Sequence, residues 1–214
     1  MKKISARAFF ALALAAVLLL GTAAFTVSYF VHADEWVTFS GSPHVYSGTN
    51  LSSGIVTDRA GRLLLDATEG RTYSDDALTR KSTVHLLGDR YGYIYAPLLG
   101  HYADKMIGYD RINGLFRLRE EEASAQLTIS AAVQNAALQA LDGRRGTVGV
   151  YNYETGEILC AVTAPSYDPD NVPDIENDTT DAYKGVYVNR FFDAAYTPGS
   201  IYKLLTAEAA LETV

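Results

Sequence analysis

The stretch Tyr196-Thr197-Pro198-Gly199-Ser200-Ile201-Tyr202-Lys203 decides how the C-terminal part of this chain is expected to fold. Pro198-Gly199 is a turn signal, and no helix breaker follows it, so a helix is predicted to open at Ser200. Apolar residues recur along that helix: Ile201, Leu204, Leu205, Ala209 and Leu211. A spacing of three places the Ser200 hydroxyl and the Lys203 amine on one helix face, one turn apart.

The Ser200–Lys203 pair has the chemistry of an activated nucleophile. A serine hydroxyl reacts poorly unless a nearby base takes its proton, and a lysine amine can be that base when its surroundings favour the neutral form. Backbone N–H groups at a helix start can stabilise the oxyanion formed when serine attacks a carbonyl. On these four residues alone an alternative stays open, in which Ser200 caps the helix and Lys203 is an exposed cation.

Upstream of this stretch, the chain predicts a strand, a helix and a hairpin in succession. Leu127-Thr128-Ile129 is strand-like, and Ser130 can cap a helix over 131–141 that ends at Gly143. The apolar stripe of this helix is expected at Val133, Ala137 and Leu141. Two strands at 147–151 and 158–162, joined by a turn at 154–157, form the hairpin. A long polar loop covers 164–184.

The region before residue 127 is less regular. Strand-like runs at 54–57 and 62–65 flank the turn Asp58-Arg59-Ala60-Gly61 and predict another hairpin. Thr83-Val84-His85-Leu86-Leu87 is expected to be a strand that ends at Gly88. The Glu120-Glu121-Glu122 run is interpreted as a solvated connector, because consecutive carboxylates point in different directions.

The N-terminus predicts a membrane anchor. Lys2, Lys3 and Arg7 precede Ala8–Val31, a run of 24 residues without charge that is long enough to cross a bilayer as a helix. The positive charges place the N-terminus in the cytoplasm and the bulk of the chain outside it. A cleaved signal peptide, with Val31-His32-Ala33 as its cleavage site, is the rival interpretation, and it exports the remaining chain equally.

Composition excludes several other classes of protein. The net charge of -7 argues against a nucleic-acid partner. Cys160 is the one cysteine, so no internal disulfide and no cysteine zinc site can form, and it is expected to be a buried apolar residue. No cofactor and no metal site are predicted.

The order of these motifs resembles the class B penicillin-binding proteins. Asn189-Arg190 followed by the Pro-Gly-Ser-x-x-Lys helix start is similar to their nucleophile segment. The upstream matches are Leu127-Thr128-Ile129 with Gln134, the strand over 146–151, Thr155-Gly156-Glu157-Ile158-Leu159-Cys160-Ala161, and Pro165-Ser166-Tyr167-Asp168-Pro169. Residues 58–61 and 83–88 resemble segments of the non-catalytic pedestal that precedes the catalytic domain.

The resemblance implies a membrane-anchored peptidoglycan D,D-transpeptidase. Its nucleophile would be Ser200 and its activating base Lys203; its partners would be peptidoglycan stem peptides, beta-lactams and possible wall-synthesis proteins. The implied fold class is α+β: a transmembrane helix (1–33), a mixed, mainly β pedestal with a dimerisation-like character (34–126), and an incomplete α/β serine transpeptidase domain (127–214). The expected location is the bacterial cell membrane, crossed once.

The chain departs from the family pattern after the nucleophile. Neither a Ser-x-Asn nor a Lys-Thr-Gly motif follows Ser200 before the sequence ends at Val214. The favoured interpretation is a partial or frameshifted transpeptidase gene whose 214-residue product alone is inactive. A catalytically dead membrane scaffold is the alternative, and a beta-lactam sensor or beta-lactamase relative is a third.

Overall fold

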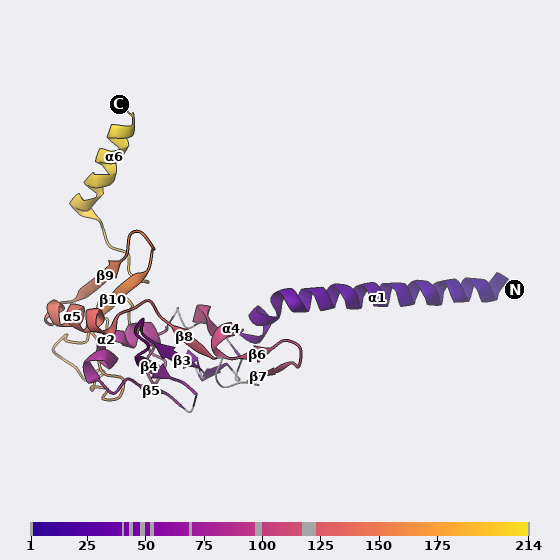
Figure 1. Cartoon of the computed structure of the whole chain (residues 1–214), viewed down its shortest axis with the longest axis horizontal. Helices are drawn as coiled ribbons and strands as arrows, with labels where there is room; N and C mark the ends of the chain where they lie inside the picture. The colour runs from indigo at the N-terminus through magenta and orange to yellow at the C-terminus, as the bar shows by residue number, and fades with distance from the viewer. Residues whose placement is uncertain are drawn as a thin grey trace.

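The computed structural model describes residues 2–39, 41–42, 45–47, 50–51, 54–68, 70–96, 100–116 and 123–213. A long N-terminal helix, α1 (Lys2–Val37), projects from one side of a mixed α/β body, and the C-terminal helix α6 (Lys203–Thr213) projects from another (Figure 1). Within α1, residues Ala6–Val37 are long and apolar enough to span a membrane, as the sequence predicted.

A four-stranded sheet forms the part of the body nearer to α1. Its strands are β3 (Ile55–Thr57), β4 (Leu63–Asp66), β5 (Thr72–Tyr73) and β8 (Ser124–Gln126), in the order β5-β4-β3-β8. The predicted hairpin at 54–65 is confirmed, since β3 and β4 pair antiparallel. β8 pairs parallel with β3, so the strand predicted at 127–129 in fact lies three residues earlier.

Several further short elements belong to the N-terminal part of the body. They are β1 (Tyr46–Ser47) paired with β2 (Asn50–Leu51), the helix α4 (Ala103–Met106), and the hairpin of β6 (Tyr109–Asp110) and β7 (Leu115–Phe116).

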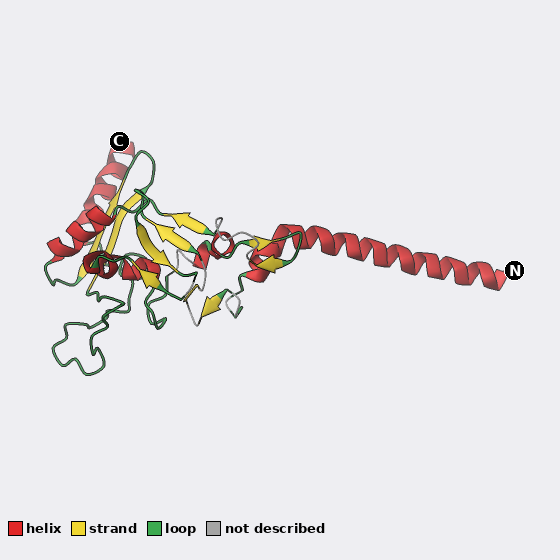
Figure 2. Cartoon of the chain, turned by 60° about the horizontal axis from the view of Figure 1, so that its bottom comes forward, coloured by secondary structure: helices red, strands yellow, loops and turns green. Residues whose placement is uncertain are grey.

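The second half of the body is a hairpin covered by two helices (Figure 2). β9 (Gly146–Tyr151) pairs antiparallel with β10 (Ile158–Ala164), which confirms the predicted hairpin. The helices α2 (Ala77–Leu87) and α5 (Ala131–Leu141) pack against each other and against β10. Cys160 is buried on β10, as expected.

The strand predicted at 83–87 was wrong, because these residues form the last turns of α2. The Asp76 carboxylate caps the helix by accepting the N–H groups of Leu78 and Thr79, and Gly88 ends it with a φ of 79°. Residues 82–87 are all buried. A helix that is buried around its whole circumference shows no amphipathic period, so a short apolar run cannot be told from a strand by pattern alone.

The buried face of α5 also differs from the predicted stripe. Val133 is 37% exposed, whereas Gln134 is fully buried along with Ala131 and Ala137. Gln134 can be buried because its amide is paired. Its Oε1 accepts the N–H of Ala161 at 2.7 Å, and its Nε2 donates to the carbonyl of Ser82 at 3.1 Å. The polar side chain therefore replaces the valine on the packed face and joins α2, α5 and β10.

The start of α5 is capped by a residue from far upstream. Ser130 occupies the N-cap position, but its side chain makes no capping hydrogen bond, contrary to prediction. The buried Asp58 carboxylate in the β3–β4 turn instead accepts the N–H of Ala131 at 3.3 Å and those of Ala60 and Arg62 at 2.8 and 2.9 Å. Burial raises the pKa of Asp58, but these three donors outweigh it and leave the pKa below its ordinary value.

Replacing Asp58 with alanine should therefore destabilise the fold far more than replacing Ser130 with alanine. Asp58→Ala leaves three backbone donors without their acceptor and should cost about 2–3 kcal/mol. Ser130→Ala removes no capping bond and should stay within about 0.5 kcal/mol. Urea unfolding of the full chain in detergent, followed by near-ultraviolet circular dichroism, measures both. Equal losses in the two variants would contradict the assignment of Asp58 as the cap.

One hydrophobic core joins the two halves of the body. It contains Leu65 of β4 and Leu86 of α2 together with Ile129, Ala131 and Ala161 from the C-terminal half. Residues on both sides of position 126 thus exclude water from the same core, and each half covers apolar side chains of the other.

Candidate active site

Ser200 and Lys203 lie one turn apart at the junction of a 3-10 turn and α6. The 3-10 turn η2 covers Gly199–Tyr202, and Gly199 enters it with a φ of 56°, a conformation that favours glycine. The backbone N–H of Lys203 donates to the carbonyl of Ser200. Because residues three apart in a 3-10 turn lie above one another, this geometry directs the two side chains to the same side of the chain.

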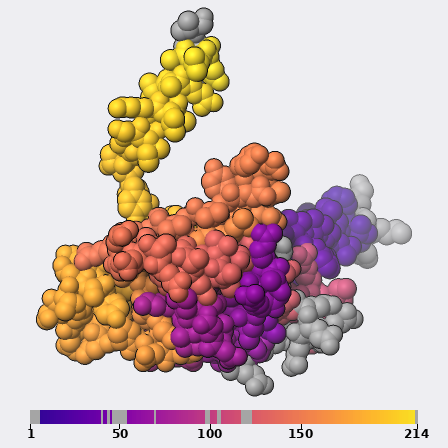
Figure 3. Space-filling view, turned by 60° about the vertical axis from the view of Figure 1, so that its left-hand side comes forward, coloured from indigo at the N-terminus to yellow at the C-terminus, as the bar shows by residue number. Residues whose placement is uncertain are grey.

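The described residues leave this pair open to solvent. Ser200 and Lys203 are exposed, and so are Ile201, Leu204 and Leu211, at 74%, 74% and 84%. Figures 1 and 3 show why: α6 stands away from the rest of the body. Ser200 therefore has a helix start beside it but no wall around it in the part of the chain that the structure describes.

The segment leading to Ser200 is fixed to the body by Asn189 and Arg190. The buried Asn189 donates from Nδ2 to the carbonyl of His85 at 2.7 Å, and its Oδ1 accepts the N–H of Phe191 at 3.2 Å. Arg190 Nε donates to the carbonyl of Ala164, at the end of β10, at 3.1 Å. The Asn-Arg pair, which the sequence indicated only by resemblance, thus ties this segment to both α2 and β10.

His85 is a second anchor of the same segment, and sequence reasoning missed it. Its ring is buried, and its Nε2 lies 2.7 Å from the carbonyl of Val186. Burial lowers the pKa of His85 from 6.5 to about 4, so the ring is neutral at physiological pH and donates through Nε2–H. Its main-chain carbonyl receives the bond from Asn189. Interpreting 83–87 as a strand concealed this role.

The stability of the fold should fall as pH drops from about 6.5 to about 4. In that window His85 takes up a proton in the unfolded chain but stays neutral in the folded one. A shift of this size corresponds to about 3 kcal/mol. His85→Gln, which keeps an amide donor, should flatten this part of the profile, whereas His101→Gln at an exposed site should not. Urea unfolding at a series of pH values tests this, and an unchanged slope in His85→Gln would contradict it.

Ion pairs attach the start of the 164–184 loop to α2 and to the residues that follow α2. Arg80 donates to both carboxylate oxygens of Asp168 at 2.7 Å, and Arg90 pairs with Asp170 at 2.5 Å. The hydrogen bond from Arg80 holds the pKa of Asp168 below its ordinary value. The Ser166 hydroxyl donates to the carbonyl of Lys81 at 2.5 Å. The motif over 165–169 therefore fixes the loop to α2 through Ser166 and Asp168.

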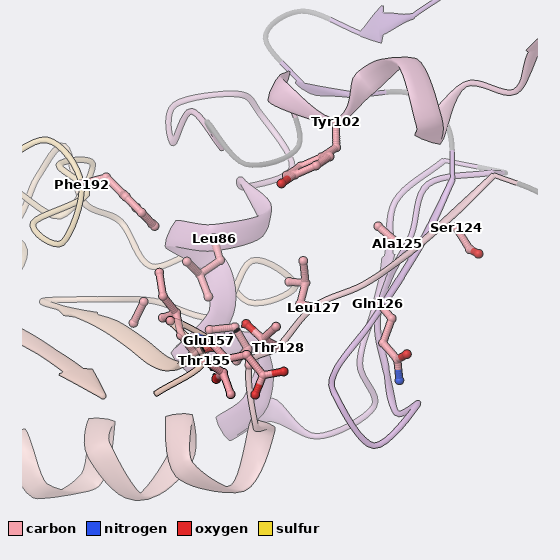
Figure 4. Close-up of a pocket in the computed structure, with 14 residues that line it drawn as sticks. Leu86, Tyr102, Ser124, Ala125, Gln126, Leu127, Thr128, Thr155, Glu157 and Phe192 are labelled. Atoms are coloured by element: carbon pink, nitrogen blue, oxygen red, sulfur yellow. Dashed lines mark hydrogen bonds between the residues drawn. The ribbon is translucent and has the colours of Figure 1, made fainter. Parts of the chain in front are cut away.

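A cavity of about 570 Å³ opens beside α2 and β8 (Figure 4). It opens between Leu86 of α2, Tyr102, strand β8 with the residues after it, and the β9–β10 turn, and Phe192 closes one side. Neither Ser200 nor Lys203 lines it. Within the described ranges, no three His, Cys, Asp or Glu side chains come together as a metal site.

Comparison with known proteins agrees with this architecture. Residues 146–213 match the penicillin binding protein transpeptidase domain. The peptidoglycan D,D-transpeptidase PbpA of Mycolicibacterium smegmatis is 30% identical over 151 residues, covering 55% of this chain and 31% of that relative. The peptidoglycan D,D-transpeptidase FtsI homolog of Chlorokybus atmophyticus is 36% identical over 105 residues. The match covers 44% of this chain and 14% of that relative. The chain thus spans less than a third of these curated relatives.

Solved structures give the same result. The D,D-transpeptidase domain of a peptidoglycan glycosyltransferase from Eggerthella lenta superposes with a TM-score of 0.54 at 25% identity, covering 75% of this chain and 37% of that one. Pseudomonas aeruginosa PBP2, solved in complex with WCK 5153, gives 0.50 at 26% identity, covering 76% and 39%. The fold is that of part of a penicillin-binding transpeptidase. Residues 146–213 match its transpeptidase domain, and the superposed region also includes residues before them. The relatives and solved structures thus support the resemblance to part of a class B penicillin-binding protein and the mixed α/β fold class.

Proposed function

We propose that this protein serves peptidoglycan crosslinking as a D,D-transpeptidase that acts through an acyl-serine intermediate. The observation that carries the proposal is the placement of Ser200 and Lys203 one turn apart at a helix start, inside the segment that matches the transpeptidase family. In this reaction Ser200 Oγ attacks the carbonyl between the two terminal D-alanines of a stem peptide. An ester forms to the serine, and the terminal D-alanine leaves with a proton. An amine of a second stem peptide then takes the acyl group and frees the serine.

The proposed roles follow from the chemistry of the two side chains. Lys203 would act as the base that takes the proton of Ser200 during attack and returns it to the leaving amine. The backbone N–H of Ser200 lies at the helix start, where it can donate to the oxyanion. A beta-lactam places its strained amide carbonyl at the same position and would leave a stable ester on Ser200.

The exposure of Ser200 leads us to expect no detectable acylation of the purified 214-residue chain. One oxyanion donor is available at Ser200, but the described residues offer no second donor beside it and no surface to position a substrate. Loss of one oxyanion donor typically costs about a hundred- to a thousandfold in rate, and loss of positioning adds to it. The same exposure favours the alternative function, a membrane scaffold without catalytic activity.

Labelling of the product of the native locus separates the two functions. An N-terminal tag identifies that product whatever its length, and a fluorescent penicillin reports an acylated serine after denaturing electrophoresis. The transpeptidase proposal expects a labelled tagged band that excess unlabelled penicillin removes. An unlabelled tagged band would overturn it in favour of the scaffold.

We propose that α1 crosses the cell membrane once and that the pedestal (34–126) and the transpeptidase part (127–214) lie outside the cytoplasm. Ala6–Val37 supports this by length and hydropathy, and Lys2, Lys3 and Arg7 supply the cytoplasmic positive charge. A reporter that fluoresces only in the cytoplasm, fused to the C-terminus, should stay dark, while the same reporter at the N-terminus should fluoresce. A bright C-terminal fusion would contradict the topology.

A further inference from the structure

The C-terminal turns of α1 are joined to the β6–β7 hairpin by polar contacts. The Tyr29 hydroxyl donates to the carbonyl of Arg111 at 2.9 Å and lies 2.9 Å from the Tyr109 hydroxyl. The Arg111 guanidinium forms an ion pair with Asp34, one turn and a half further along the helix. Figures 1 and 2 both place the hairpin alongside this end of α1. The depth of the helix in a bilayer therefore fixes the depth of the hairpin.

The length of α1 determines that depth. The segment Ala6–Val37 has 32 residues, whereas about 20 helical residues cross a hydrocarbon core about 30 Å thick. The uncharged residues 8–28 alone extend about 32 Å and suffice to cross it. The part of α1 from Tyr29 onwards, where the hairpin is attached, is then expected to lie at the bilayer surface.

Side chains along that part of α1 fit a bilayer surface. Trp36 stacks on His32 and Phe25, with ring centroids 6.1 Å apart in both pairs, and aromatic rings of this kind gather at headgroup level. The charged Asp34–Arg111 pair is expected among the headgroups, because charged side chains are costly to place in hydrocarbon. The boundary between hydrocarbon and headgroups thus falls close to Tyr29 and the hairpin.

The turn of the hairpin presents apolar side chains on a backbone in which three N–H donors are already paired. Ile112 is 86% exposed and Leu115 is 52% exposed. The Asp110 carboxylate accepts the N–H groups of Ile112 at 2.8 Å and Asn113 at 3.2 Å, and the N–H of Gly114 donates to the Asp110 carbonyl at 2.8 Å. Paired backbone groups lower the cost of bringing this turn to an apolar boundary.

We propose that the β6–β7 hairpin is a membrane-contact element, and that Ile112 and Leu115 rest in the headgroup–acyl boundary of the bilayer that α1 crosses. The inference depends on α1 being a membrane span, and it commits to a lipid surface as the partner. The transmembrane helix and the hairpin then both contact lipid. These two contacts hold the body at a fixed distance from the membrane and in a fixed orientation, whereas the helix alone would leave its orientation free.

Nitroxide labels at three exposed positions test the proposal in the full chain reconstituted in lipid nanodiscs. Ile112→Cys probes the hairpin, Leu19→Cys probes the middle of α1, and Tyr153→Cys, at a site 83% exposed on the β9–β10 turn, is the aqueous control. Collisions with oxygen, which dissolves in lipid, are compared with collisions with a water-soluble nickel chelate. Cys160 is replaced by alanine throughout.

We expect the labels at positions 19 and 112 to collide mainly with oxygen and the label at position 153 to collide mainly with the nickel chelate. The label at 112 should lie at a shallower depth in the bilayer than the label at 19. If 19 is in lipid but 112 behaves like 153, the hairpin proposal is overturned while the anchor stands. If 19 itself collides with nickel, the membrane anchor fails and the hairpin proposal fails with it. The labelling of Ser200 by penicillin is independent of either outcome.

Discussion

Replacing Ser200 with alanine should abolish covalent labelling by a fluorescent penicillin in the product of the native locus. The variant lacks the only atom at that position that can form the ester. Ser200 is exposed in the 3-10 turn that precedes α6, and no hydrogen bond that the structure describes depends on its hydroxyl, so the fold should not change. The expected signal is below detection at every penicillin concentration, at unchanged protein level.

Lys203→Arg should reduce the labelling rate nearly as much, although it keeps the positive charge. Arginine stays protonated and cannot take the proton of Ser200, so a purely electrostatic role would be preserved while a base role is lost. Lys184→Arg, at an exposed lysine paired with Asp181 in the 164–184 loop, is the matched control and should label normally. Normal labelling of Lys203→Arg would exclude Lys203 as the base.

Gln134→Leu should destabilise the fold by about 1–3 kcal/mol despite the similar size of the two side chains. The substitution leaves the N–H of Ala161 on β10 and the carbonyl of Ser82 on α2 without the amide that pairs them at 2.7 and 3.1 Å. An unpaired buried polar group costs about 1–3 kcal/mol, and the Ala161 N–H becomes one, whereas the Ser82 carbonyl keeps its place in the hydrogen-bond ladder of α2. Since Gln134 joins α2 to β10, the loss should also loosen the packing of α2 on the hairpin.

The measurement is urea unfolding of the full chain in detergent, and Gln139→Leu on the exposed face of the same helix is the control. The control changes helix propensity equally and should stay within about 0.5 kcal/mol. A Gln134→Leu variant as stable as Gln139→Leu would contradict the assignment of Gln134 as a connector between the two halves of the body.

Local signals were sufficient for the elements with a clear period or turn. The β9–β10 hairpin, helix α5, the β3–β4 hairpin and the apolar N-terminal helix were all predicted, because strand-like runs, helix propensity and an uncharged run are properties of neighbouring residues. The 3-10 turn that opens the last helix was predicted only as a helix start, since Pro198-Gly199 marks a boundary without fixing the type of turn.

What could not be predicted depends on contacts distant in sequence. Asp58 caps α5 from 73 residues away, and this made the capping role assigned to Ser130 wrong. Val133 is displaced from the buried face because Gln134 finds partners on α2 and β10. His85 was missed because a helix buried on every side carries no period. Of the candidate site, the sequence predicted Ser200 and Lys203, which stay a prediction, and the structure adds that both lie exposed where α6 stands away from the body (Figure 1).

The most direct test of the central proposal is to locate the penicilloyl group by mass spectrometry in the labelled product of the native locus. Trypsin cleaves after Arg190 and Lys203, and the peptide Phe191–Lys203 contains a single serine, Ser200. We predict that fragmentation of this peptide places the adduct on Ser200. An adduct on another residue, or a folded protein without any adduct after saturating penicillin, would contradict the assignment of Ser200 as the transpeptidase nucleophile.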